Sequence, residues 1–236
     1  REGQAEEGNR TNRNGRPSMK FRCSSIGRLM TEPRSKSEGP LSVGAKTYIR
    51  ELAAQEIFGV DFVVSSKAME KGIECESDSI ALLNTVRGLS LEKNTERKSN
   101  DFITGECDLF DEQTRRGHDI KTSWSIATFP IVVSDCEDKL YEFQMRGYMA
   151  LWDADEWEVN YCLVDTPDRL TGFEPMELHF VSNIPEHMRV TTWTVKRDME
   201  KEAAIFEKVK HAREYFKAVI QEFDQTHSNN ELRKAA

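Results

Sequence analysis

Long apolar runs and closely paired cysteines are both missing from this chain of 236 residues. No apolar stretch approaches the roughly 18–20 residues that a membrane-spanning helix needs, and no signal-peptide pattern is present, so we expect no membrane partner. The five cysteines lie far apart, and no two of them form a C-x-x-C pair. This spacing argues against a zinc ribbon or a disulfide framework and favours reduced thiols in a cytosolic protein.

A surplus of basic charge is missing as well. The chain has 33 Lys and Arg against 41 Asp and Glu, a formal net charge of −8. Taken alone, this balance argues against a generic nucleic-acid coat protein. With 38% hydrophobic and 31% charged residues, the composition is typical of a globular chain that can bury a sizeable core.

The charge is unevenly distributed along the chain. Residues 1–50 hold eleven Lys and Arg against five Glu, a net charge of +6, which leaves −14 on residues 51–236. Such an asymmetry indicates either a solvated basic tail or a basic end that meets a polyanion.

The first residues differ from the rest in composition. Residues 1–18 are polar, rich in Gly and Asn, and lack any apolar period, so we expect them to be a disordered segment or a remnant of expression. The chain does not begin with Met, and Met19 is a candidate natural start. We expect residues 19–236 to form a single domain.

Hydrophobic periodicity predicts helices around a central group of strands, in an α/β (α+β) layered fold. The predicted helices cover 26–30, 43–58, 67–87, 137–152 and 197–223, and the predicted strands cover 102–110, 118–123, 156–164 and 176–181. Ser24 or Ser25 is expected to cap the first helix, and Gly59 and Gly88 follow two of the others.

The two middle strands carry a candidate metal site. Asp119 and Lys121 are two residues apart, so on a strand both point to one face. Asp108 lies on the preceding strand, and pairing through the short turn between them would bring Asp108 next to Asp119. Two carboxylates suit a hard divalent cation, and the lysine suits the positioning of a water molecule, although such charges also occur on solvated sheet faces.

A third acid lies in the predicted helix 67–87. Glu76 falls on the stripe that Met69, Ile73, Ile80 and Leu83 define, and a buried acid must pair, accept hydrogen bonds or bind a metal. Gly72, one turn earlier, lowers helix propensity, and we expect another backbone to approach it closely.

Polar groups also fall on the apolar stripe of the predicted helix 137–152. Gln144 and Tyr148 share a face with Leu140 and Leu151. Gln144 either satisfies a buried backbone group or holds Lys121 or an attacking water.

Taken in chain order, these residues resemble the motif series of the PD-(D/E)XK nucleases. The series here is Gly72-x-x-x-Glu76, Asp108, Asp119-x-Lys121 and Gln144-x-x-x-Tyr148. The stretch CSSIGRLMTEPRS at 23–35 is similar to the start of the phage lambda-type alkaline exonucleases and the related YqaJ-like viral recombinases. The likeness covers about residues 20–165. Cys107 replaces the proline of the motif, and Asp119 stands where many relatives have Glu, but neither change removes a ligand.

The resemblance implies a restriction-endonuclease-like core, a central mixed β-sheet flanked by helices. It implies two Mg²⁺ or Mn²⁺ ions held by Asp108, Asp119, the backbone carbonyl of Ile120 and Glu76. Lys121 would then activate the water and Gln144 would steady it, with Tyr148 and Gly72 in support. The resemblance also implies a 5′-phosphate contact at Ser24, helped by Arg22 or Arg16, and a DNA-backbone contact at Arg34.

The implied activity is metal-dependent 5′→3′ hydrolysis of linear double-stranded DNA to mononucleotides, leaving 3′ single strands for recombination. The implied partners are double-stranded DNA ends, two further copies in a toroidal homotrimer, and a single-strand annealing protein. The implied location is the bacterial cytosol, as a phage or prophage protein.

Two rival functions remain open on the sequence. One is another PD-(D/E)XK nuclease, such as a restriction endonuclease or an iron–sulfur nuclease of the CRISPR-adaptation type, although the scattered cysteines do not favour a cluster. The other is a non-catalytic DNA-binding protein of the same fold, which we would expect to lack at least one ligand.

Overall fold

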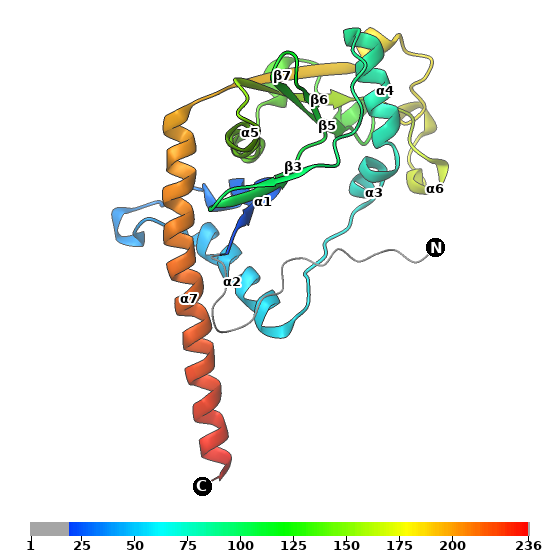
Figure 1. Cartoon of the computed structure of the whole chain (residues 1–236). Coiled ribbons are helices and arrows are strands. Elements are labelled where there is room, and N and C mark those ends of the chain that lie inside the picture. Colours follow the sequence, from blue (N-terminus) through cyan, green and yellow to red (C-terminus); the bar gives the residue numbers. More distant parts are fainter. Residues whose placement is uncertain (1–18, 236) are drawn as a thin grey trace.

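The structure is a computed structural model that describes residues 19–235, with side chains up to residue 228. The predicted N-terminal segment 1–18, including Arg16, lies outside the described residues. Two mixed β-sheets form the centre, and helices cover them (Figure 1). This arrangement confirms the α/β (α+β) class with mixed sheets flanked by helices.

The smaller sheet has the order β1-β3-β2 and the larger one β4-β5-β6-β7. Strands β1 and β3 are parallel, as are β5 and β6, and the other pairs are antiparallel. The strands are β1 Phe21–Arg22, β2 Arg97–Ser99, β3 Ile103–Glu106, β4 Leu109–Asp111, β5 Arg116–Thr122, β6 Glu156–Cys162 and β7 Val190–Lys196.

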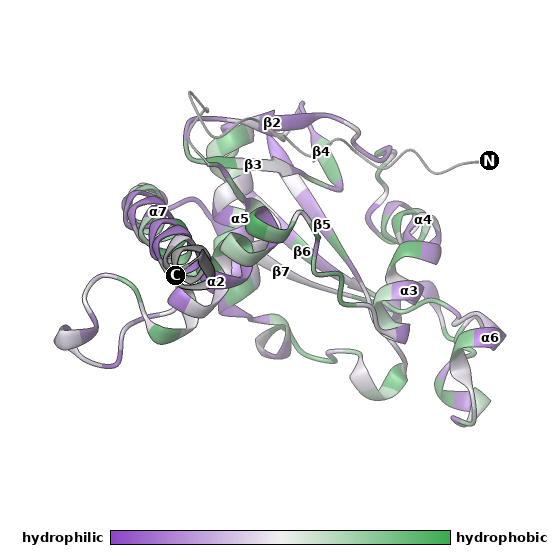
Figure 2. Ribbon diagram, turned by 90° about the horizontal axis from the view of Figure 1, so that it is seen from below, coloured by the Kyte–Doolittle hydropathy of each residue, from purple (hydrophilic) through white to green (hydrophobic). Residues whose placement is uncertain are grey.

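The two faces of the larger sheet are covered by different helices. Helix α5 lies against one face, and α3 and α4 lie against the other (Figure 2). Helix α7 packs on α2 and then extends beyond the rest of the molecule (Figure 1). The α-helices are α1 Cys23–Leu29, α2 Val43–Phe58, α3 Lys67–Glu74, α4 Glu76–Arg87, α5 Lys139–Trp152, α6 Asp168–Thr171 and α7 Met199–Ala235.

The main core lies between the small sheet and helices α1, α2, α5 and α7. Its fully buried side chains include Phe21, Ile26, Ile49, Met145 and Trp157. A second apolar cluster joins α4 to the other face of the large sheet through Leu83, Leu109, Cys162 and Val164, among others. The β5–β6 pair is therefore covered on both faces, as is expected for parallel strands.

Helices α1 and α5 approach each other closely because α1 has a glycine at the contact. A Cβ atom on Gly27 would lie 2.6 Å from the Cα of Leu140 and 2.7 Å from its carbonyl oxygen. Only glycine fits such a contact, and it brings the start of α5 over the small sheet.

The predicted strand at 176–181 is wrong. Met176–Leu178 form a short 3₁₀ helix, and the backbone N–H groups of Val181 and Ser182 donate to the Asp165 carboxylate at 2.6 and 2.9 Å. The Val181 N–H, which a strand would pair with its neighbour, thus binds a side chain instead. The strand beside β6 is instead β7, whose alternating sequence VTTWTVK was not assigned from the sequence.

The predicted helix 67–87 is divided at Cys75 into α3 and α4. Its predicted apolar stripe is confirmed in α4, where Ile80 and Leu83 are buried, and is wrong in α3. Met69 and Ile73 are 50% and 80% exposed. In place of Met69 and Ile73, the buried face contains Lys71, Cys75 and Ser79, which continue to the predicted Leu83 in steps of four residues. Two polar residues on the buried face explain why hydrophobic periodicity gave the wrong phase.

Gly72 was expected to allow a close backbone approach, and this expectation is also wrong. A Cβ atom at Gly72 would meet nothing within 4 Å.

Candidate active site

The acidic cluster lies where the chain passes from the small sheet to the large one. The predicted strand 102–110 is two strands, β3 and β4, and Asp108 lies between them. The β4–β5 hairpin pairs Leu109 with His118, which places Asp108 beside the middle of β5. Its Oδ2 accepts a hydrogen bond from the backbone N–H of Ile120 at 2.7 Å. The hairpin therefore brings Asp108 to the segment that carries Asp119 and Lys121, as the sequence predicts.

Asp119 and Lys121 point to the same face of β5. Asp119 is 1% exposed, and its Oδ2 lies 2.6 Å from the Lys121 Nζ. This contact lacks hydrogen-bond geometry, so the buried Oδ2 has an ionic neighbour but no hydrogen-bond donor. The Lys121 ammonium also lies 4.4 Å from the centre of the Tyr141 ring, on α5. Lys121 is thus held between a carboxylate and an aromatic face.

Helix α5 packs on the face of the sheet that carries Asp119 and supplies a side chain that binds Asp119. The Gln144 amide Nε2 donates to Asp119 Oδ1 at 3.1 Å and to the Tyr148 hydroxyl at 3.3 Å. The Tyr148 hydroxyl donates in turn to the backbone carbonyl of Glu106 at 3.0 Å. Gln144 therefore holds Asp119, rather than a backbone group or Lys121 as the sequence suggested. Leu140, expected on the same face, is 46% exposed.

The charges of the cluster affect one another strongly. Burial, and then the negative charge of Asp119, raises the pKa of Asp108 to about 7. For Lys121, burial acts to lower the pKa, but the nearby negative charges, that of Asp119 foremost, outweigh it and the net pKa is raised. The site thus combines an ammonium that stays charged with a carboxyl that keeps its proton up to neutral pH.

Glu76 begins helix α4 and lies at the edge of the cluster. Its negative charge contributes to the raised pKa of Asp108. Its side chain is 24% exposed and forms an ion pair with Lys93, from the loop before β2. The expectation of a buried Glu76 is therefore only partly met, because the loop provides a partner at the surface.

The donor set suits a divalent cation. Within residues 19–235, no three His, Cys, Asp or Glu side chains are gathered closely enough to hold a metal ion by themselves. However, Asp119 keeps a buried oxygen without a hydrogen-bond donor, and Asp108 lies against the same backbone. Mg²⁺ retains several waters and needs only one or two carboxylates, so Asp108, Asp119 and the Ile120 carbonyl fit such an ion.

The candidate 5′-phosphate residues lie at the start of α1. The helix begins at Cys23, with Arg22 at the capping position and no side-chain cap, so the prediction of Ser24 or Ser25 as the cap is wrong. Ser24 lies in the first turn and is exposed, as are Arg22 and Arg34. Cys23 packs beside Gly105 of β3, which leads into Asp108.

Sequence reasoning missed three residues around the site. Tyr141 lies one helical turn before Gln144, and Lys93 pairs with Glu76. Lys71 is fully buried and donates to the carbonyls of Ser123, Trp124 and Val164 at 2.8, 3.0 and 2.8 Å. It fastens α3 to the ends of β5 and β6. Of the three, only Tyr141 could have been found from the sequence, because its spacing from Gln144 places both on one face of a helix.

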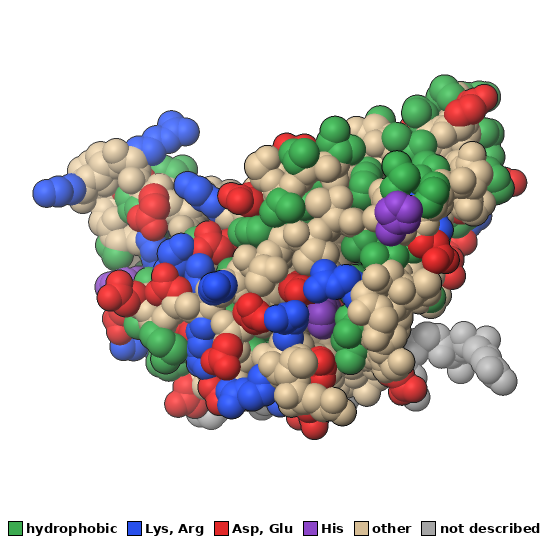
Figure 3. All heavy atoms as spheres, turned by 90° about the horizontal axis from the view of Figure 1, so that it is seen from above, with side chains coloured by type: hydrophobic (Ala, Val, Ile, Leu, Met, Phe, Trp, Pro, Cys, Tyr) green, Lys and Arg blue, Asp and Glu red, His purple; other side chains and the backbone are tan. Residues whose placement is uncertain are grey.

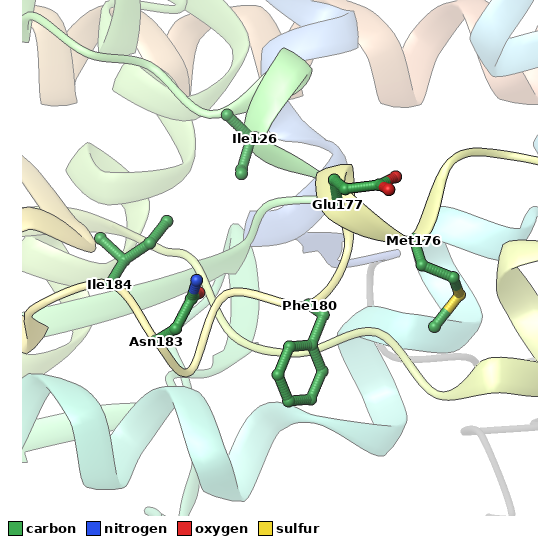
Figure 4. A pocket seen from close by; sticks show the side chains of 6 residues that line it. All are labelled: Ile126, Met176, Glu177, Phe180, Asn183 and Ile184. Carbon is green, nitrogen blue, oxygen red and sulfur yellow. The ribbon is translucent and has the colours of Figure 1, made fainter.

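A separate pocket of about 420 Å³ lies beyond the end of β5 (Figure 4). Its lining is mostly apolar and includes Ile126, Met176, Phe180 and Ile184, with Glu177 and Asn183 at the sides. It shares no lining residue with the acidic cluster.

All five cysteines are buried and unbridged, and they do not form a cluster. No helix within residues 19–235 has the length and apolarity to cross a membrane.

Solved structures resemble most of this fold. A phage-related exonuclease from Haemophilus somnus is 36% identical, with a TM-score of 0.82, and the alignment covers 87% of this chain and 97% of that one. The alkaline exonuclease LHK-Exo from Laribacter hongkongensis is 18% identical, with a TM-score of 0.65 over 89% of this chain and 94% of its own. LHK-Exo has also been solved in complex with dAMP. Protein-family models and curated proteins gave no match.

The fold and the acidic cluster define a nuclease of the PD-(D/E)XK type. At 36% identity over nearly all of a solved relative, the chain belongs to the phage-related exonucleases of the lambda-type alkaline exonuclease and YqaJ-like group.

Proposed function

We propose that this nuclease is a metal-dependent 5′→3′ exonuclease that degrades one strand of linear double-stranded DNA to mononucleotides and leaves 3′ single strands. The observation that supports the proposal best is the joint placement of Asp108, Asp119 and Lys121, with Gln144 bonded to Asp119. These are the groups that metal-assisted attack on a phosphodiester requires.

Asp108, Asp119, the Ile120 carbonyl and Glu76 would hold two Mg²⁺ or Mn²⁺ ions. When bound, such ions neutralise charge on the phosphate and lower the pKa of a coordinated water. The Lys121 ammonium donates a hydrogen bond that orients the attacking water. Gln144 keeps Asp119 in place through its Nε2, and Tyr148 fixes Gln144 against β3. These side chains are in position before substrate arrives, which reduces the reorganisation that the reaction needs.

The exposed start of α1 supplies the proposed contact for the 5′ end of the DNA. Ser24 would bind the 5′-phosphate, with Arg22 or Arg16 beside it, and Arg34 would contact the DNA backbone. Backbone N–H groups in a first helical turn, together with nearby arginines, favour an anion.

We extend the proposal to the assembly and the biological role. The enzyme would act as a toroidal homotrimer in the bacterial cytosol, encoded by a phage or prophage. It would work beside a single-strand annealing protein in recombination. Sedimentation of the purified chain tests the trimer.

Digestion of labelled DNA tests the activity. We expect a linear duplex labelled at its 5′ ends to release labelled mononucleotides at once with Mg²⁺, and the same duplex labelled at its 3′ ends to release label late. Closed circular DNA should stay intact. Cutting of the circle would favour a restriction-like endonuclease, and retardation of DNA without hydrolysis would favour a non-catalytic binding protein.

A further inference from the structure

One lysine outside the motif series touches the acidic cluster. Lys93 lies between α4 and β2, and its ammonium forms an ion pair with the Glu76 carboxylate. The Lys93 side chain is 53% exposed and that of Glu76 is 24% exposed. Exposed ion pairs are usually weak and are often incidental, so the significance of this one depends on how Lys93 is positioned.

The loop that carries Lys93 is fastened on both sides. On one side, Asn84 of α4 accepts from the Leu91 N–H at 3.2 Å and donates to the Leu91 carbonyl at 2.9 Å. On the other side, the Asn94 N–H donates to the Asp108 carbonyl at 2.7 Å, and the Asn94 side chain donates to the Cys107 carbonyl at 3.1 Å. Lys93 is therefore placed by the backbone of Asp108 itself.

The Lys93 ammonium lies in the field of several carboxylates. Besides its ion pair with Glu76, it feels the negative charges of Asp108 and Glu106. Because Lys121 already pairs with Asp119, two carboxylates of the cluster each have an ammonium partner. The third, Asp108, accepts from the backbone N–H of Ile120. Two of the three carboxylates thus already have a cationic partner within the chain.

We propose that Lys93 is an internal counter-cation that competes with the divalent metal for Glu76 and thereby sets the metal affinity of the site. The proposal rests on the proposed function, because it requires that the acidic cluster bind a divalent cation. For Glu76 to bind the metal, its ion pair with Lys93 must break. The positive charge of Lys93 then remains close to the metal, because Asn94 holds the loop to the backbone of Cys107 and Asp108. Both effects lower the affinity for a divalent cation.

Mn²⁺ binding to the full chain, measured by calorimetry without DNA, tests this competition. Lys93→Met should lower the Kd for Mn²⁺ by about three- to tenfold, and the difference should shrink at high salt because the pair is partly exposed. Lys93→Arg keeps the charge and should bind Mn²⁺ like the wild type. Lys98→Met is the matched control, because Lys98 pairs with Glu96 and lies over the Trp152 ring rather than at Glu76. It should leave the Kd unchanged.

A double-mutant cycle shows whether Lys93 acts through Glu76. In a Glu76→Gln background, Lys93→Met should change the Kd much less than in the wild type. If the wild type binds Mn²⁺ but Lys93→Met binds it no more tightly, the competition is refuted while the metal site stands. If the wild type binds no Mn²⁺ at millimolar concentration, the metal site of the proposed function fails, and the competition fails with it.

Discussion

Asp119 depends on a side chain from another element for its orientation. Its Oδ1 accepts from Gln144, and its Oδ2 lies beside the Lys121 ammonium. Tyr148 links Gln144 to the Glu106 carbonyl, two residues before Asp108. The two carboxylates of the cluster are therefore connected through α5 as well as through the β4–β5 hairpin. Such supporting contacts determine how well a ligand group is pre-oriented.

Removing the Gln144 side chain should weaken catalysis without unfolding the protein. Gln144→Ala leaves Asp119 without its only hydrogen-bond donor among the described side chains. We expect kcat/KM on a linear duplex to fall by about 10- to 100-fold. Gln113→Ala, in the exposed turn after β4, is the control and should retain full activity. Equal losses in the two variants would contradict a supporting role for Gln144.

The stability of the metal-free protein should depend on pH through Asp108. The pKa of Asp108 is raised from 3.8 to about 7 in the folded chain, so the folded chain keeps a proton that the unfolded chain releases. The stability that Asp108 contributes is thus present below about pH 4 and is lost as the pH rises through about 7. In EDTA, Asp108→Asn should raise the Tm, and by more at pH 8 than at pH 5. A gain that is the same at both pH values would argue against the raised pKa.

The sequence predicts the convergence of Asp108, Asp119 and Lys121 because it follows from strand alternation and a short turn. It does not predict the Glu76–Lys93 pair, because that contact depends on a loop held by Asn84 and Asn94. Loops of this kind leave no periodic signal in the chain.

Helix α1 occupies a tight position between the small sheet and α5. The missing Cβ of Gly27 lets the start of α5 pass at contact distance, and α5 carries Tyr141, Gln144 and Tyr148 to the site. The close packing of α1 on α5 therefore helps to fix the position of the α5 side chains at the acidic cluster.

Two glycine substitutions should have opposite effects on stability. Gly27→Ala forces a Cβ into the Leu140 backbone and should lower the free energy of unfolding by about 1–3 kcal/mol. Gly72→Ala, in a helix with open space at that position, should raise it by about 0.4–1 kcal/mol. Urea denaturation measures both changes. Destabilisation by Gly72→Ala would contradict the open space at this position and would favour the close backbone approach predicted from the sequence.

Most helices and most of the large sheet could be predicted because their patterns are regular. Helix α2 matches its predicted bounds, with Ser42 as its N-cap and Gly59 in a left-handed conformation at its end. The errors have specific causes. Lys71 is buried because three strand-end carbonyls satisfy its ammonium, which no hydrophobic pattern reveals. In addition, Asp165 accepts from the backbone N–H of Val181, at the end of the predicted strand 176–181, and no sequence pattern reveals this contact.

The molecule as a whole is acidic, yet positive and negative side chains are mixed on the face that Figure 3 shows. Lys and Arg alternate with Asp and Glu across one face, whereas apolar side chains gather at one end (Figure 3). Part of the net charge of −8 comes from Glu76, Asp108 and Asp119. A net negative charge is therefore compatible with a nuclease, provided that the DNA contacts a basic part of the surface. Under the proposed function, the acidic residues of the cluster lie between residues 76 and 119, whereas the excess of Lys and Arg lies in residues 1–50.

The central claim is that the Asp108–Asp119–Lys121 cluster performs the hydrolysis, and one comparison tests it most directly. Linear duplex DNA is incubated with Mg²⁺ and either the wild type or Lys121→Ala, and released nucleotide and DNA binding are measured in parallel. Lys217→Ala, on α7 and paired with Glu214, is the matched charge control. We predict that Lys121→Ala loses at least about 100-fold in rate while it still binds DNA, and that the control keeps full activity. Wild-type digestion by Lys121→Ala would contradict the assignment of the site.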